Sequence, residues 1–379
     1  MAKNMRSIPV ILMCCLVIVK AFNIVVNISS DTTLTSSLTC KCASDGIHVD
    51  IYVNTTHHGS HSSVTDRSRS NKSTGNIDDK SPKTRRAGEL SEKKCGTYYP
   101  PTPIPYMTRR RRYEQNPLSG QSAPEYDVHH LYKGKQTLAR EFPHMALIGR
   151  VKKNNSFVQW FCGGSLISHS FVLTAAHCLI SDKLVVRLGE LDTSTEMDDA
   201  NPQDIGIKKL FPHPEFNTST HYHDIGLIEL EKQVTLSGYV AIACLDNHKE
   251  VDEQHMLKIT GWGQTELAGR HNSYLLKGNV YVKPHIVCKE SYKKTSKLPI
   301  GIRDDIQICA VGPDNEDTCK GDSGGPLQAF KEFYGTTRVY SIVGVTSFGL
   351  PCGYSDQDYP GVYTRVYYYL SWIESIVWP

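Results

Sequence analysis

The ten residues from Asp317 to Pro326, Asp-Thr-Cys-Lys-Gly-Asp-Ser-Gly-Gly-Pro, place a serine hydroxyl among carboxylates and glycines. A serine hydroxyl is a weak nucleophile unless a base accepts its proton and a third group holds that base. The chain supplies both upstream, a histidine in Thr-Ala-Ala-His-Cys and a carboxylate in His-Asp-Ile-Gly-Leu. These residue types predict nucleophilic catalysis by Ser323, with His177 as base and Asp224 as its partner.

The order His177, Asp224, Ser323, in the motifs T-A-A-H-C, D-I-x-L and G-D-S-G-G-P, resembles the chymotrypsin-like serine proteases of the trypsin family. The resemblance covers residues 131–379. It implies that His177 moves the proton, that Asp224 orients the imidazole, and that the backbone N–H groups of Gly321 and Ser323 hold the oxyanion.

The resemblance also assigns a specificity pocket. Asp317 lies six residues before Ser323, at the position that forms the pocket floor in this family, and Gly349 and Gly361 match the wall positions. A buried carboxylate favours a cationic side chain because a buried charge must be paired, and glycine walls leave room for a long one. We therefore expect cleavage after Arg or Lys.

Composition and the N-terminus favour a secreted protein. The 379 residues carry a net charge of +3 and 39% hydrophobic residues, which suits a soluble chain and gives no reason to expect a nucleic-acid partner. Lys3 and Arg6 precede an apolar run of signal-peptide length, with cleavage near Ala21; a membrane anchor is the alternative. The twelve cysteines suit an oxidising compartment. N-glycosylation sequons, which matter only in the secretory pathway, occur at Asn27, Asn54, Asn71, Asn154 and Asn217.

The chain divides into a signal peptide (1–21), a pro-region (22–130) and a protease domain (131–379). The pro-region is polar and basic with few periodic apolar residues, so we expect it to be mostly disordered, with a degenerate clip-like start. The domain alternates short apolar segments with turn residues, which predicts an all-β fold. The resemblance adds two six-stranded antiparallel β-barrels, with the site between them. An amphipathic helix over residues 369–377 would close the domain.

The cysteines extend the resemblance to the arthropod clip-domain proteases, particularly the group that includes Snake and Persephone. A clip module has six cysteines, but only Cys40 and Cys42 remain for one here, and their pairing stays open. In related zymogens a linker cysteine ties the pro-segment to the catalytic domain, which implies the pair Cys95–Cys244. The other pairs that the family implies are Cys162–Cys178, Cys288–Cys309 and Cys319–Cys352.

Zymogens of this family are switched on by a cut that frees a new N-terminus, which pairs with the aspartate before the serine, here Asp322. The resemblance, aligned backward from Glu141, implies that this terminus is Leu131 and that the cut falls after His130. A pocket with Asp317 at its floor does not suit histidine, so we expect a different protease to make the cut. The predicted function is a cascade endopeptidase of immune or developmental type. Its partners would be an upstream activating protease, a downstream zymogen and serpin-type inhibitors.

A digestive trypsin and a non-catalytic binding protein are the alternatives to this function. A digestive trypsin needs only a short activation peptide, whereas this pro-region is long and carries a lone cysteine at Cys95. A non-catalytic binding protein usually lacks a member of the catalytic trio, and none is missing. No cofactor is required. The acidic stretch from Glu190 to Asp199 leaves calcium binding open beside a solvated loop.

Overall fold

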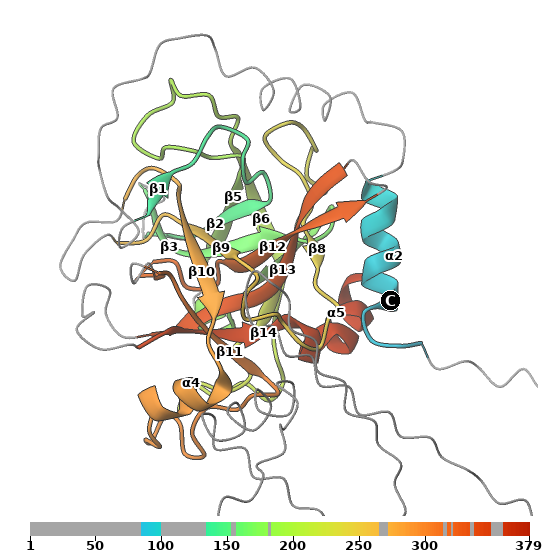
Figure 1. Cartoon of the computed structure of the whole chain (residues 1–379). Coiled ribbons are helices and arrows are strands. Elements are labelled where there is room, and N and C mark those ends of the chain that lie inside the picture. The colour runs from blue at the N-terminus through green and yellow to red at the C-terminus, as the bar shows by residue number, and fades with distance from the viewer. Residues whose placement is uncertain are drawn as a thin grey trace, which may run out of the picture. The chain divides into compact units, whose positions relative to one another are not determined.

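A computed structural model describes residues 85–99, 134–152, 157–180, 183–264, 272–313, 317–319, 321–333, 337–349 and 359–379 (Figure 1). Contacts divide the chain into residues 1–79 and 80–379, and every described residue belongs to the second unit. The predicted signal peptide, Cys40, Cys42, His130, Leu131 and Cys352 lie outside the described residues.

Six antiparallel strands close into a first barrel in the order β2-β3-β4-β7-β6-β5. Side chains alternate across a strand, and in β5 Leu184, Val186 and Leu188 are buried while Val185 and Arg187 are partly exposed. Buried and partly exposed side chains thus alternate with a period of two residues, which explains why the short apolar segments form strands. The strands are β2 Met145–Val151, β3 Val158–Leu166, β4 Phe171–Thr174, β5 Leu184–Leu188, β6 Gln203–Pro212 and β7 Gly226–Leu230.

A second barrel follows in the order β9-β10-β11-β14-β13-β12 and closes through pairing of β9 with both β10 and β12. β1 (Lys135–Gln136) adds to β10, and β8 (Cys244–Leu245) pairs in parallel with β13. Its strands are β9 Leu257–Gly261, β10 Leu276–Val282, β11 Gln307–Val311, β12 Pro326–Phe333, β13 Thr337–Phe348 and β14 Gly361–Arg365. The predicted all-β architecture of two six-stranded barrels is confirmed.

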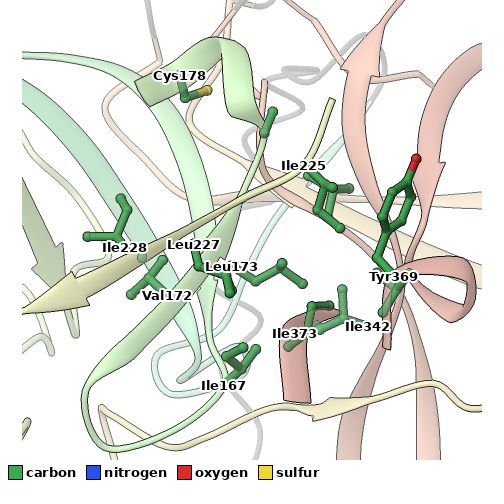
Figure 2. Packing of buried hydrophobic residues seen from close by; sticks show 14 of the residues in the cluster. Ile167, Val172, Leu173, Cys178, Ile225, Leu227, Ile228, Ile342, Tyr369 and Ile373 are labelled. Carbon is green, nitrogen blue, oxygen red and sulfur yellow. The ribbon is translucent and has the colours of Figure 1, made fainter. Parts of the chain in front are cut away.

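One apolar core connects the first barrel to β13 and to the C-terminal helix (Figure 2). Ile225 and Leu227, which follow Asp224 closely in sequence, are fully buried in this core. They lie there with Ile342 and Ile373. Burial of one such side chain stabilises the fold by about 1.5–3 kcal/mol. The segment that carries Asp224 is therefore held firmly between the barrels and the helix.

The described helices are short. α4 spans His285–Ser291, and the C-terminal helix α5 spans Leu370–Val377 after the 3₁₀ turn η2 (Val366–Tyr369), close to the helix that the sequence predicts. A second 3₁₀ turn, η1 (Ala176–Leu179), follows β4. Within these described residues, no helix has the length and apolar character that crossing a membrane requires.

A further helix, α2 (Glu89–Tyr98), lies within the pro-region, for which composition predicts little order, and it packs beside α5 and β8 (Figure 1). The backbone N–H of Ser91 donates to Glu374 Oε1 at 2.7 Å. The hydroxyl of Tyr99 donates to the carbonyl of Ile242. Only Ser91 and Cys95 of the helix are buried, so it has no apolar stripe that a periodicity search could detect.

Candidate active site

His177 and Asp224 come from adjacent elements of the first barrel. His177 lies in η1, which begins two residues after the end of β4. Asp224 lies two residues before β7, which pairs with β4. The backbone N–H of His177 donates to Asp224 Oδ1 at 3.0 Å, and its Nδ1 lies 2.8 Å from Oδ2. The carboxylate thus contacts both the backbone and the ring of the histidine, which fixes the orientation of the imidazole.

Asp224 is only 2% exposed and receives further hydrogen bonds from the second barrel. Ser347 Oγ donates to its Oδ2 at 2.6 Å, and Thr364 Oγ1 donates to its carbonyl oxygen at 2.8 Å. Burial by itself would raise the pKa of Asp224, but the hydrogen bonds and charge of His177, with the bond from Ser347, hold that pKa below its usual range. The sequence analysis did not identify Ser347 or Thr364, since a single hydroxyl in a strand has no motif of its own.

Ser323 lies on a turn that touches the first barrel. Its carbonyl oxygen accepts from the N–H of Gly163 in β3 at 2.8 Å, and Cys178 Sγ lies 3.6 Å from the same oxygen. Cys178 follows His177 in sequence, so the backbone of Ser323 is beside the histidine turn. Within the described residues, no hydrogen bond joins Ser323 Oγ to His177.

The backbone of this turn requires glycine at two positions. Gly321 has φ 106° and Gly324 has φ 78°, in the left-handed region that side chains other than glycine avoid. A Cβ at residue 324 would also lie 2.1 Å from Thr174 Oγ1. In the described part of the chain, the N–H groups of Gly321 and Ser323 have no hydrogen-bond acceptor, so both can serve a ligand.

The two predicted wall glycines, Gly349 and Gly361, lie beside Asp317. An ideal Cβ on Gly361 would lie 2.4 Å from Asp317 Oδ1, and one on Gly349 would lie 3.8 Å from its Oδ2. Asp317 is 9% exposed, and its Oδ1 accepts from the N–H of Thr318 at 2.7 Å. Burial raises the pKa of Asp317 to about 7. The carboxyl is therefore a buried anion site that a cation would stabilise.

Asp322 belongs to the same turn as Ser323, and it is buried, with an exposure of 1%. Its carboxylate accepts from the N–H groups of Gly263 at 2.8 Å and Cys319 at 2.9 Å. A Cβ on Gly261 would lie 1.9 Å from Asp322 Oδ1, so glycine makes room for this carboxylate. No cation among the described residues pairs with it, and burial raises the pKa of Asp322 to about 6.

The sequence model of the trypsin family, described as Trypsin, matches residues 131–373. The chain belongs to the trypsin family of serine endopeptidases. Serine protease snk of Drosophila melanogaster is 41% identical over 242 residues, which cover 62% of this chain and 54% of the relative. This chain therefore spans about half the length of that relative.

Two further matches support the assignment. Phenoloxidase-activating factor 1 of Holotrichia diomphalia is 34% identical over 306 residues, covering 75% of this chain and 80% of the relative. The solved structure of neuropsin, a serine protease of mouse brain, superposes with a TM-score of 0.54 at 29% identity, covering 65% of this chain and 99% of the other. The resemblance to the arthropod clip-domain group that includes Snake is confirmed.

Disulfides of this trypsin-family protease join Cys162 to Cys178, Cys288 to Cys309 and Cys95 to Cys244. Cys319 is also disulfide-bonded, and Cys352, its predicted partner, lies outside the described residues. The first of these bonds ties the His177 turn to β3, and the last ties α2 to the protease fold.

The acidic stretch that left calcium open is engaged with protein groups. Arg187 pairs with Glu190 at 3.1 Å, and Arg140 pairs with Asp199. Asp198 Oδ2 accepts the N–H of Asp192 at 2.9 Å. Glu190 and Asp199 therefore each have an arginine partner, and Asp198 has a backbone donor.

Proposed function

We propose that the protein is the secreted zymogen of a trypsin-like endopeptidase that cleaves after Arg or Lys and acts in a proteolytic cascade. The observation that carries this proposal is the joint placement of two groups of residues. The His177–Asp224 pair lies beside the turn of Ser323. The buried Asp317, six residues before Ser323, lies beside Gly349 and Gly361.

In the proposed mechanism, Ser323 Oγ attacks the carbonyl carbon of the scissile peptide bond while His177 Nε2 accepts its proton. His177 then gives the proton to the leaving amine, and water hydrolyses the acyl-enzyme by the reverse sequence. Asp224 keeps the remaining ring proton on Nδ1 and stabilises the imidazolium. The N–H groups of Gly321 and Ser323 hold the oxyanion; loss of one such donor typically costs a factor of about 10²–10³ in rate.

The proposed specificity follows from the charge of Asp317. An arginine or lysine side chain that enters between Gly349 and Gly361 would bring a cation to the buried carboxyl and favour its ionised form. An apolar side chain would leave that carboxyl unpaired and desolvated. Electrostatics and space therefore favour the same long cationic residues.

The proposed activation depends on Asp322. In the described part of the zymogen this carboxylate has backbone donors but no cation, so a new α-amino group would be its natural partner. The family match begins at residue 131, which supports Leu131 as that terminus and His130 as the residue before the cut. The corresponding proposed domains are a signal peptide (1–21), a pro-region (22–130) and a protease domain (131–379).

The cascade role is supported by the relative named phenoloxidase-activating factor 1, whose name describes activation of another protein. The signal-like N-terminus and the sequons favour secretion. We infer a cascade of immune or developmental type, with an upstream activating protease, a downstream zymogen as substrate and a serpin-type inhibitor as partners. A digestive role would not explain a pro-region that stays bonded to the protease through Cys95.

The specificity can be tested with fluorogenic peptides that differ only in the residue before the cleaved bond. Activated enzyme should hydrolyse Arg and Lys peptides with far higher kcat/KM than Phe or Ala peptides. Asp317→Ser should cost about 3 kcal/mol of transition-state stabilisation for the Arg peptide, because the substrate cation loses its partner. Its kcat/KM should fall by a factor of about 10². A wild-type preference for Phe or Ala would contradict the proposed pocket.

A further inference from the structure

Two histidines and a glutamate form a cluster outside the proposed catalytic, specificity and activation residues. The ligand atoms of His213, Glu215 and His223 all lie within 4.8 Å of one another. The rings of His213 and His223 are stacked, with centroids 5.3 Å apart and planes inclined by 13°. Glu215 Oε2 lies 3.4 Å from His223 Nδ1. The cluster lies where β6 has ended at Pro212 and immediately before Asp224.

The backbone fixes both histidines in place. The N–H of His213 donates to the carbonyl of Ile225 at 3.0 Å, and the N–H of Ile225 donates to the carbonyl of His223 at 2.9 Å. His223 has φ 56°, in the left-handed region that residues other than glycine seldom adopt.

We propose that His213, Glu215 and His223 bind Zn²⁺. Two imidazole nitrogens and one carboxylate oxygen are a ligand set that zinc accepts, with a fourth position open to water. The side chain of Glu215 is 65% exposed, so it can rotate toward a metal held by the two rings.

Aromatic packing explains part of the cluster but not all of it. His213 contacts the rings of Tyr369 and Trp372, and Tyr369 Oη lies 3.1 Å from His223 Nδ1. Those contacts account for the burial of the rings. They do not account for a carboxylate beside His223 or for the left-handed backbone there.

The position of His223 couples this site to the proposed active site. A metal shared with Glu215 would compete with Tyr369 for His223 Nδ1 and move the peptide that leads into Asp224. Asp224 depends on hydrogen bonds of 2.6–3.0 Å to Ser347 and His177. Bound zinc should therefore lower kcat more than it raises KM, since substrate contacts at Asp317 are made elsewhere.

Binding is best measured on the full-length zymogen carrying Ser323→Ala, by titration calorimetry with ZnCl₂ and by the visible absorption of bound Co²⁺. We expect one metal per chain and a tetrahedral Co²⁺ spectrum. His213→Asn, Glu215→Gln and His223→Asn should each weaken binding about tenfold or more. Asparagine is chosen at 223 because it tolerates the left-handed backbone. Circular dichroism checks that each variant is folded.

The matched control is His248→Asn, which removes an exposed histidine that pairs with Asp246 away from the cluster. This variant should bind Zn²⁺ as tightly as the parent. Equal affinity in all three cluster variants, or no Zn²⁺ binding at micromolar concentrations, would overturn the site.

The coupling is tested in the activated enzyme by the ratio of kcat with and without ZnCl₂, which a chelator should restore. Glu215→Gln should bring that ratio close to one. Inhibition of equal strength in Glu215→Gln would show that zinc acts through other residues and would overturn the coupling to Asp224. Because the zymogen titration needs no catalysis, failure of the metal site and failure of the proposed protease function give different results.

Discussion

The charge of the Asp317 carboxyl depends on which ligand occupies the specificity pocket. With the pocket empty, burial raises its pKa to about 7, so near neutral pH the group is divided between charged and neutral forms. A bound cation favours the carboxylate, and the proton is released as the ligand binds. Affinity for cationic ligands should therefore fall as the pH drops below about 7 and level off above it.

Benzamidine, a small cation that acts as a competitive inhibitor, can measure this effect. We expect its inhibition constant for the activated enzyme to rise by up to about tenfold per pH unit below about 7, because the protonated carboxyl cannot pair with the amidinium. Asp317→Asn should bind benzamidine weakly at every pH. An inhibition constant that stays level between pH 5.5 and 8 would show that Asp317 remains ionised throughout.

At the residue scale, the sequence predicts residues that belong to motifs and misses those that act from strands. His177, Asp224 and Ser323 have strong local signatures, and the structure brings His177 and Asp224 into contact beside the Ser323 turn. Ser347 and Thr364 reach Asp224 from β13 and β14 only after the two barrels pack together. No local pattern could reveal them, because their role depends on that packing.

At the scale of elements, α2 shows how a tether can order a polar segment. Composition predicts all-β from residue 131 on, and the resemblance supplies the two barrels, but no periodicity predicts α2. The helix is held by the Cys95–Cys244 bond, by Ser91 donating to Glu374, and by Lys331 pairing with Glu92 at 3.0 Å. A partly exposed ion pair such as Lys331–Glu92 contributes at most about 1 kcal/mol, so the covalent bond should dominate.

The tether should keep the pro-segment attached after activation. Cleaved protein should migrate as one band on a gel without reductant and as two with it. The double variant Cys95→Ser, Cys244→Ser should give two bands in both conditions and unfold with a free energy lower by about 2–4 kcal/mol, since the cross-link no longer restricts the unfolded chain. Two bands from unreduced wild-type protein would refute the tether.

At the scale of the whole molecule, the proposed activation would join a new N-terminus at Leu131 to the buried Asp322, in the turn that carries Ser323. An ion pair in so dry a place is favourable only when both charges are hydrogen-bonded and the rest of the inserted segment fits. Leucine at residue 131 is apolar and suits such insertion, whereas a charged first residue would not. Because the Asp317 pocket does not suit histidine, the zymogen should remain inactive even when concentrated.

The activation bond can be tested by His130→Arg. This variant should be cut by trypsin after residue 130 and become active, because the new N-terminus is the same Leu131. The wild-type zymogen, treated in the same way, should not be cut at that bond. A variant that is cut at residue 130 yet stays inactive would show that the terminus is wrongly placed, and wild-type zymogen that cuts itself there would contradict the specificity.

Ser323 is proposed to be a nucleophile that His177 and Asp224 activate. Labelling with an organophosphorus fluoride tests it most directly, since this reagent reacts with an activated serine and leaves ordinary serines unmodified. Activated protein should take up one label, located on the peptide that contains Ser323. Ser323→Ala and His177→Ala should take up none. Labelling that persists in Ser323→Ala, or its absence from activated wild-type protein with a free Leu131, would contradict the account.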